Sequence, residues 1–469
     1  MAFEPDSRPR VAVVGAGIAG LAAAHELARD GRVDVVVLEG SPRTGGKLLR
    51  GEVAGVATDL GAESVLARRP EGLALIDELG LAGEVVHPVT QTAAVWSRGA
   101  LRALPAGHVM GVPTDVRSLS ASGVVSATAV ARAALDEVLP ATRVSDDVSV
   151  GSFVGARLGR AVVDRLVEPL LGGVYAGRAG ELSLQATLPA VAEVAGQGSL
   201  MRGLRTRAVP ASDTGPVFAG LPGGVARLAE AAAASLVARG VVVRLDSTVR
   251  SLERTPTGWR LLVGAAAAPS TVDADAVVIA VPAAPASRLL GASVPAAAAD
   301  LAAIDYASMA IVTLALPPSA FPNSIAGSGF LVPAVEGRVI KAATFSSVKW
   351  GWYPGDLIMV RCSIGRHGDV EELQQSDDEL IAVALRDLAV VAGLRGVPID
   401  AIVSRWGGGL PQYGVGHLSR VARVKAAVSS VGGLAVCGAA YDGVGIPACI
   451  GSGRAAATQV LGGLLGERQ

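Results

Sequence analysis

The stretch VAVVGAGIAGLAAAHELARD, from Val11 to Asp30, constrains the fold of this chain more than any other. Its apolar, β-branched start predicts a buried strand, and its second half predicts a helix because apolar residues recur at helical spacing. Gly15, Gly17 and Gly20 fall on the turn between them. There they allow a tight turn, close approach of the backbone to a pyrophosphate, and close packing of helix on strand. The segment alone leaves open whether this turn holds a dinucleotide or only connects strand and helix.

A second predicted strand, VDVVVLEGS, ends in Glu39. This acid lies about 20 residues beyond the last glycine, where a carboxylate accepts hydrogen bonds from a ribose diol. A surface glutamate at the end of a strand is the alternative interpretation. Strand, glycine turn, helix, strand and acid agree, however, and together they predict a dinucleotide site whose phosphates face the N-terminus of the helix.

Length and composition exclude several classes of protein. The 469 residues suffice for two or three domains and a large core. The formal net charge of −1 offers no basic field for nucleic acid. Cys362, Cys437 and Cys449 have no metal-ligand spacing, so no metal site is expected. No stretch reaches the ~20 apolar residues that span a bilayer, and the start lacks an apolar signal segment. We therefore expect a cytoplasmic protein, with peripheral membrane contact left open.

Two further motifs follow the acid. SPRTGGKL contains Arg43, the pair Gly45-Gly46 and Lys47, and TDLGAES follows it. Glycines let a second backbone segment approach a cofactor, and cations suit phosphate. The order GxGxxG, acid, GGK and DxGA resembles the FAD-containing amine oxidase and protoporphyrinogen oxidase superfamily. The resemblance implies FAD and an α/β fold, in which a Rossmann-like FAD-binding domain of the glutathione-reductase/amine-oxidase type carries a mixed-sheet substrate domain and a helical insert.

The superfamily returns to its flavin near the C-terminus, and GGLAVCGAAYDGVGIPACIGSGRAAATQVLGGLL resembles that segment. The resemblance places Gly438 and Ala439 along the pyrophosphate and ribityl chain, and residues 444–446 near the isoalloxazine ring. Many relatives carry an acid where Ala439 stands, so here a backbone N–H would replace a side chain. The implied cofactor-binding residues are Gly15, Gly17, Ile18, Ala19, Gly20, Glu39, Gly40, Ser41, Arg43, Gly45, Gly46, Lys47, Gly61, Ala62, Glu63, Ser64, Val249 (through its backbone, at the adenine), Gly438, Ala439, Val444, Gly445 and Ile446.

The branch of the superfamily is decided by the substrate half. Amine oxidases usually frame their substrate with two aromatic rings, and aromatic residues are only 3% of this chain. LPAGHVMGVPTD, ATFSSVKWGWYPG and SRWGGGLPQYGVGHLSRV resemble the protoporphyrinogen/coproporphyrinogen oxidases of haem biosynthesis, in the form found in the soluble bacterial branch. That resemblance implies oxidation of coproporphyrinogen III to coproporphyrin III by O₂, with H₂O₂ formed in three flavin cycles. Protoporphyrinogen IX oxidation, amine oxidation, and binding without catalysis, as in GDP-dissociation inhibitors, stay open as alternatives.

A porphyrinogen is a large apolar ring with carboxylates on its rim, so its site needs an aliphatic cavity with a few cations. Arg68, Arg69, Lys341 and Lys349 are the candidates, although Arg68-Arg69 could equally be a solvated pair at the start of a helix, and Lys341 could face solvent. No dedicated general base stands out. His417 is a candidate for substrate contact or proton transfer, but a structural role is favoured for it. Tyr413 is a second candidate for proton transfer.

The cofactor segments are dispersed along the chain, so the FAD-binding domain must be assembled from residues 1–97, 215–288 and 431–469. We assign residues 98–112 and 289–430 to the substrate domain and residues 113–214, which have helical character, to the insert. The expected partners are a porphyrinogen and O₂. Transient contact with a ferrochelatase-type enzyme or a membrane surface is a further expectation, and no nucleic acid is expected.

Overall fold

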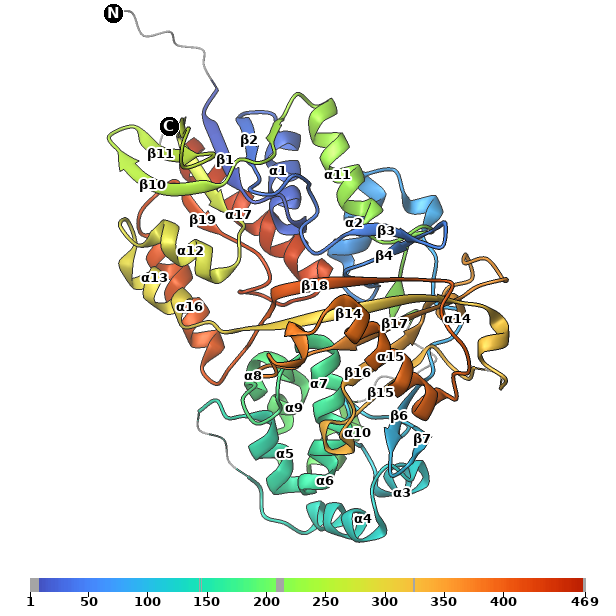
Figure 1. Cartoon of the computed structure of the whole chain (residues 1–469). Coiled ribbons are helices and arrows are strands. Elements are labelled where there is room, and N and C mark those ends of the chain that lie inside the picture. Colours follow the sequence, from blue (N-terminus) through green and yellow to red (C-terminus); the bar gives the residue numbers. More distant parts are fainter. Residues whose placement is uncertain (1–7, 143, 145, 208–214, 324, 467–469) are drawn as a thin grey trace, which may run out of the picture.

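The central element of the first domain is a five-stranded parallel sheet (Figure 1). The structure is a computed structural model, which describes residues 8–142, 144, 146–207, 215–323 and 325–466. Apart from the edge strand Val242–Arg244 and exposed first residues, the short strands are apolar and buried on both faces, as parallel strands in the interior of an α/β domain usually are. In spatial order they are β19 (Leu434–Val436), β13 (Ala276–Ile279), β1 (Arg10–Val14), β2 (Asp34–Leu38) and β9 (Val242–Arg244).

Each face of this sheet is covered by a different layer. Helices α1 (Ile18–Asp30), α11 (Arg227–Ala238) and α17 (Ile446–Gly466) pack on one face with α2 (Pro70–Glu78). The other face packs against an antiparallel sheet and three helices: β10 (Val249–Thr255), β11 (Gly258–Val263), β12 (Ser270–Ala274), α12 (Ala283–Leu290), α13 (Pro295–Ala302) and α16 (His417–Ser429). This layering confirms the predicted Rossmann-like unit.

The second domain is built on a seven-stranded mixed sheet, antiparallel except where β15 pairs with β6. Its strands in order are β18 (Asp400–Pro411), β14 (Tyr306–Leu316), β17 (Ile358–Ile364), β16 (Ile340–Phe345), β15 (Gly329–Leu331), β6 (Ala93–Ser97) and β7 (Ala100–Ala103). Alternate side chains pack on α15 (Asp377–Ala392), which begins with a capping box between Ser376 and Glu379. The opposite face of the sheet is left for the cavity described below.

Shorter elements connect these layers. They are β3 (Arg50–Val53) paired with β4 (Val56–Asp59), β5 (Val65–Leu66) paired with β8 (Phe218–Ala219), and α14 (Ser346–Lys349) after β16.

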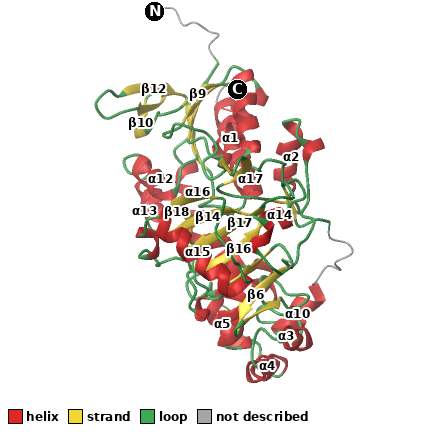
Figure 2. Cartoon of the chain, turned by 45° about the vertical axis from the view of Figure 1, so that its right-hand side comes forward, coloured by secondary structure: helices red, strands yellow, loops and turns green. Residues whose placement is uncertain are grey.

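A helical insert forms the end of the molecule away from α1 (Figure 2). Its helices surround an apolar core of their own. They are α3 (Val116–Ser122), α4 (Ala127–Ala134), α5 (Val150–Leu158), α6 (Arg160–Val162), α7 (Glu168–Tyr175), α8 (Leu184–Thr187), α9 (Pro189–Val194) and α10 (Leu200–Arg207), with a π-helical turn over Val163–Val167.

Strand pairing and packing differ in two places from the predicted domain boundaries. Strand β6, which we assigned to the FAD-binding domain up to residue 97, pairs with β15 and so belongs to the seven-stranded sheet. Helices α13 and α16, which lie in the range assigned to the substrate domain, pack into the same apolar core as β1 and β13. Both differences arise from contacts between residues far apart in the chain. The three-part division itself stays a prediction.

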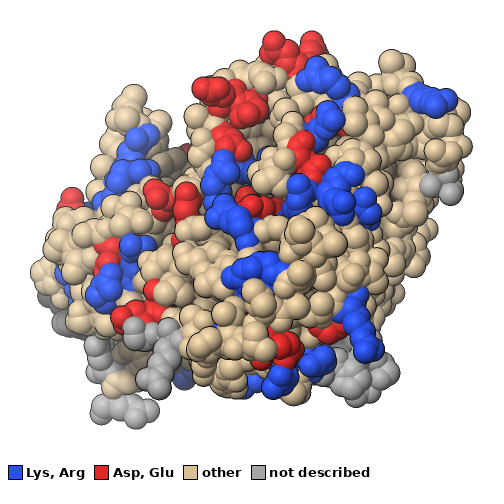
Figure 3. Space-filling view, turned by 90° about the horizontal axis from the view of Figure 1, so that it is seen from below, with Lys and Arg blue, Asp and Glu red and all other residues tan. Residues whose placement is uncertain are grey.

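The surface shows no segregation of charge on the face seen from below, where Lys and Arg side chains are interspersed with Asp and Glu (Figure 3). Within the described part of the chain, no helix has both the length and the apolar character needed to cross a membrane.

Candidate active site

One cavity of about 610 Å³ lies where the two domains and the insert meet. It opens at the carboxyl ends of the parallel strands, the position where ligands bind in open α/β sheets. Gly15 follows β1, Glu39 follows β2, residues 280–282 follow β13, and Gly438 follows shortly after β19. Segments that are far apart in the sequence therefore converge on a single site, as a cofactor bound by several segments requires.

The three glycines of the turn differ in whether the fold itself has room for a side chain at their positions. Gly15 has φ +103°, and a Cβ atom there would lie 2.8 Å from the Ala280 carbonyl oxygen. A Cβ on Gly20 would lie only 1.9 Å from the Gly15 carbonyl oxygen. Gly17, in contrast, has ordinary backbone angles and no atom within 4 Å of such a Cβ. Its open side lines the cavity in front of the α1 N-terminus, which fits a bound pyrophosphate.

Glu39 is held at the edge of the cavity by the backbone. Its carboxylate accepts hydrogen bonds from the N–H groups of Ala16, at 2.7 Å, and Ser41, at 2.9 Å. A carboxylate has about four acceptor sites, so lone pairs remain for a ribose diol. The geometry fits the predicted role of this acid.

The second glycine segment lies directly against the first. The N–H of Gly45 donates to the Ala16 carbonyl at 2.8 Å, and Gly45 pairs with Gly17 in an isolated parallel bridge. Lys47 follows and lines the cavity, where burial lowers the pKa of its ammonium group. A bound phosphate would supply the negative charge that favours the protonated lysine.

Most of the predicted cofactor residues line this cavity. Five do not line it: Gly20, Gly40, Ser41, Arg43 and Val249. Gly20 packs closely on the glycine turn, Gly40 lies against Thr248, and Ser41 and Arg43 donate hydrogen bonds to carbonyls of their own turn. The predicted residues that line it are Gly15, Gly17, Ile18, Ala19, Glu39, Gly45, Gly46, Lys47, Gly61, Ala62, Glu63, Ser64, Gly438, Ala439, Val444, Gly445 and Ile446.

Arg361, which was not among the residues predicted from the sequence, lies on β17 and lines the cavity. Its side chain is only 7% exposed. The guanidinium contacts the Glu63 carboxylate at 3.1 Å and donates a hydrogen bond to the Gly61 carbonyl. Its Nε lies buried without a hydrogen-bond partner among the described residues. A lone arginine in the apolar strand IMVRCSI was the available signal, because arginine is rarely buried unless paired.

Glu63 lines the cavity beside Arg361 and contacts several polar and charged groups. Burial alone would raise the pKa of Glu63, but Lys349, at 3.6 Å, and Arg361 outweigh that effect. Hydrogen bonds from the Ser346 hydroxyl, at 2.8 Å, and the Trp350 indole, at 2.9 Å, act in the same direction. The pKa of Glu63 is lowered to about 2, so the carboxylate stays ionised. The Glu63 carboxylate thus contacts two cations, of which only Arg361 lines the cavity.

The remaining wall comes from the seven-stranded sheet and the insert. Apolar side chains of β14 and β18, two aromatic rings and two residues of α7 face the cavity. Prominent among them are Met309, Ile311, Leu410, Tyr306, Trp406, Gly173 and Val174.

None of the five predicted substrate contacts lines this cavity. Arg68 is exposed, and Arg69 forms an ion pair with Glu71 at 2.6 Å. Lys341 is buried, lines a second, small cavity with Glu168 and Gly172 of α7, and donates to the Gly365 carbonyl. Its pKa is lowered to about 7, mainly by burial.

The other two candidates also have protein partners. Lys349 lies over the rings of Phe218 and Trp350 as well as beside Glu63. His417 is buried and stacks on Tyr413, with ring centroids 3.9 Å apart. A role in substrate binding stays a prediction for all five.

The parallel nucleotide-binding sheet, the second mixed sheet and the shared cavity define the class of two-domain oxidoreductases that hold a dinucleotide cofactor between their domains. Within that class, the chain belongs to the family described as flavin containing amine oxidoreductase, whose profile matches residues 18–461. A flavin cofactor in a site built for a dinucleotide is FAD, so the cofactor prediction is confirmed.

Similar proteins support the same assignment. A coproporphyrinogen III oxidase from Mycobacterium leprae is 40% identical, over 94% of this chain and 96% of its own length. A protoporphyrinogen oxidase from Bos taurus is 31% identical, over 96% and 98%. A solved structure from an Exiguobacterium species, provisionally assigned as a protoporphyrinogen oxidase, has a TM-score of 0.85 and 30% identity, with 97% of this chain and 99% of that chain covered. These comparisons confirm the predicted family and fold class.

Proposed function

We propose that this protein oxidises coproporphyrinogen III to coproporphyrin III in haem biosynthesis, with FAD as cofactor and O₂ as electron acceptor. The observation that carries the proposal is the composition of the cavity. Dinucleotide-binding segments form one wall, and an apolar sheet that presents a single arginine, Arg361, forms the other. We choose coproporphyrinogen III as the substrate because the Mycobacterium leprae relative is a coproporphyrinogen III oxidase.

The reaction removes six electrons and six protons from the porphyrinogen. Three O₂ accept them, which yields coproporphyrin III and three H₂O₂. The bound flavin supplies the hydride acceptor and the route of electrons to O₂. The protein has to hold this cofactor, orient the macrocycle against it and keep water out.

Named residues are suited to those tasks. Gly17 and Gly438 leave room for the cofactor, since a Cβ on either would meet no atom within 4 Å. The side chains of Met309 and Ile311 offer an apolar surface for the macrocycle. Arg361, which lines the cavity, would bind a carboxylate at the rim of the substrate.

Protoporphyrinogen IX is the second candidate substrate, because the Bos taurus relative carries that name at 31% identity. It differs from coproporphyrinogen III in having two vinyl groups in place of two propionates, so it presents fewer carboxylates to Arg361. An amine oxidase activity deserves its own assay because two aromatic rings, those of Tyr306 and Trp406, line the cavity.

Aerobic assays of the purified protein test these proposals. We expect one FAD per chain, growth of porphyrin fluorescence and H₂O₂ on addition of coproporphyrinogen III, and a lower kcat/KM with protoporphyrinogen IX. A higher kcat/KM with protoporphyrinogen IX would make protoporphyrinogen IX, and not coproporphyrinogen III, the preferred substrate. Turnover of benzylamine without turnover of either porphyrinogen would overturn the proposal, and so would a protein that cannot be loaded with FAD.

A cytoplasmic location, and transient contact with a membrane surface or with a ferrochelatase-type enzyme, belong to the same proposal. Sedimentation of the protein with anionic lipid vesicles, and a change in porphyrin release when a ferrochelatase is added, would test these contacts separately.

A further inference from the structure

The C-terminal cofactor loop, residues 438–446, needs support from outside itself. It lines the cavity and has no regular secondary structure until α17 begins at Ile446. Gly438 and Gly443 have φ values of +126° and +131°, a region that glycine enters without steric cost. Two glycines in such a short segment leave its shape to be set by hydrogen bonds with neighbours.

Tyr413, which lies between β18 and α16, bridges the base of this loop. Its hydroxyl donates a hydrogen bond to the Ala439 carbonyl at 2.6 Å and accepts one from the Gly443 N–H at 2.9 Å. A single side chain therefore ties together two backbone groups four residues apart, on either side of the turn.

The ring of Tyr413 is itself fixed. Tyr413 is 2% exposed, and its ring stacks on His417 with an interplanar angle of 14°. The centroid of the Tyr175 ring lies 5.5 Å from that of Tyr413. Tyr175 ends α7, the helix whose Gly173 and Val174 line the cavity. Burial, acting with Tyr175, raises the pKa of the Tyr413 hydroxyl far above its ordinary value, so the hydroxyl keeps the proton that it donates to Ala439.

We propose that Tyr413 is a positioning residue, which sets the shape of the 438–446 loop and thereby the affinity and reactivity of the flavin bound there. It does not line the cavity, so it acts through Ala439 and Gly443 and is not a proton acceptor for the substrate. The part of this proposal that concerns turnover rests on the function proposed above.

The test compares Tyr413→Phe with Tyr175→Phe in the full-length protein. Both remove one hydroxyl from the same ring cluster, but only Tyr413→Phe removes both loop hydrogen bonds. We expect the Kd of the apoprotein for FAD to rise about tenfold in Tyr413→Phe, which corresponds to the loss of about 1.4 kcal/mol of binding free energy. In Tyr175→Phe the Kd should stay within about twofold of wild type. Amide hydrogen exchange of a peptide covering 438–446 should accelerate only in Tyr413→Phe.

Two further measurements separate positioning from a general loss of stability. Replacement of Tyr413 by 4-aminophenylalanine keeps a donor at the same place and should restore FAD affinity to within about threefold. With coproporphyrinogen III, Tyr413→Phe saturated with FAD should show a lower kcat at unchanged KM, together with a shifted flavin midpoint potential.

Wild-type FAD affinity and wild-type loop exchange in Tyr413→Phe would overturn the positioning role, as would equal effects of the two phenylalanine variants. Absence of porphyrinogen turnover in the wild type would instead overturn the proposed function, because the FAD and exchange measurements need no substrate.

Discussion

Gly20 lies so close to Gly15 that a Cβ on Gly20 would stand 1.9 Å from the Gly15 carbonyl oxygen. The contact is between backbone atoms and cannot be relieved by a change of side-chain rotamer. Gly17, between them, has no atom within 4 Å of a Cβ position. The same motif thus contains one glycine that the fold requires and one that only a bound ligand requires.

This contrast predicts different outcomes for two variants. Gly20→Ala should destabilise the apoprotein by about 1–3 kcal/mol or more, as overpacking does. Gly17→Val should leave the free energy of unfolding of the apoprotein within about 1 kcal/mol of wild type, but strip FAD, because a branched side chain would occupy the position of the pyrophosphate. Urea unfolding and the absorbance ratio at 280 and 450 nm measure the two effects. Stoichiometric FAD in Gly17→Val would show that the motif is only a turn.

Most residues that the sequence assigned to the cofactor line the cavity, because the signals that identify them are local. The glycine turn, Glu39, the Gly45-Gly46 pair and the 438–446 loop each depend on the conformation of a few consecutive residues. The strands that precede them then bring them together by parallel pairing, which places all their carboxyl ends at one edge.

The residues that the sequence assigned to the substrate are not among those lining the cavity, because the signals on that side are tertiary; their role stays a prediction. The position of Arg361 at the cavity depends on its ion pair with Glu63, which belongs to the other domain. Alternation in RVIKAATF could not decide which side of its strand Lys341 occupies; the structure buries it beside α7, where it donates to the Gly365 carbonyl. The placement of β6 depends on a parallel partner, β15, more than 200 residues away.

Arg361 and Lys349 offer a matched test of which cation meets the substrate. Both contact the Glu63 carboxylate, at 3.1 and 3.6 Å, but only Arg361 lines the cavity. Loss of a charged hydrogen bond costs about 1.5–3 kcal/mol, so Arg361→Met should raise KM for coproporphyrinogen III by at least about tenfold. Lys349→Met should change KM by less than about twofold. Steady-state kinetics at saturating O₂ measures both, and equal effects would assign neither residue to the substrate.

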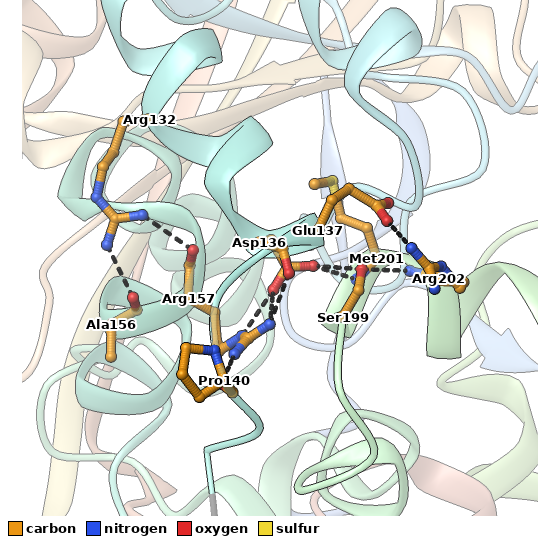
Figure 4. A network of polar contacts seen from close by, with 9 residues as sticks. All are labelled: Arg132, Asp136, Glu137, Pro140, Ala156, Arg157, Ser199, Met201 and Arg202. Carbon is orange, nitrogen blue, oxygen red and sulfur yellow. Dashed lines mark hydrogen bonds and ion pairs between the residues drawn. The ribbon is translucent and has the colours of Figure 1, made fainter.

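A buried ion pair connects segments of the insert (Figure 4). Arg157 and Asp136 are 1% and 0% exposed, and their charged atoms approach to 2.6 Å. Asp136 also accepts hydrogen bonds from the Ser199 hydroxyl and the Met201 N–H, and so connects three segments of the insert.

Removal of one partner from such a pair leaves a buried charge without compensation, which costs about 3–5 kcal/mol. We expect that loss in the free energy of unfolding for Asp136→Ala. The neighbouring Glu137 pairs with Arg202, whose side chain is 61% exposed, so Glu137→Ala should cost no more than about 1 kcal/mol. Urea denaturation of both variants decides the matter, and similar losses would argue against a dominant role of the buried pair.

His417 predicts a pH dependence of stability. Burial, with a smaller contribution from Arg420, lowers its pKa from 6.5 to about 4 in the folded protein. As pH falls through 6.5, the unfolded chain takes up a proton at this residue while the folded protein does not, so the free energy of unfolding decreases until pH reaches about 4. At pH 5 the loss from this residue is about 2 kcal/mol. Above pH 7 it vanishes.

The measurement is the difference between wild type and His417→Phe, a variant that keeps a ring against Tyr413. Asp59 titrates in the same range with the opposite sign, since burial raises its pKa to about 6, but it is present in both proteins and cancels. Between pH 7.5 and pH 5, the free energy of unfolding should therefore fall by about 2 kcal/mol more in wild type than in His417→Phe. Parallel curves over that range would mean that His417 takes up its proton equally in the folded and unfolded states.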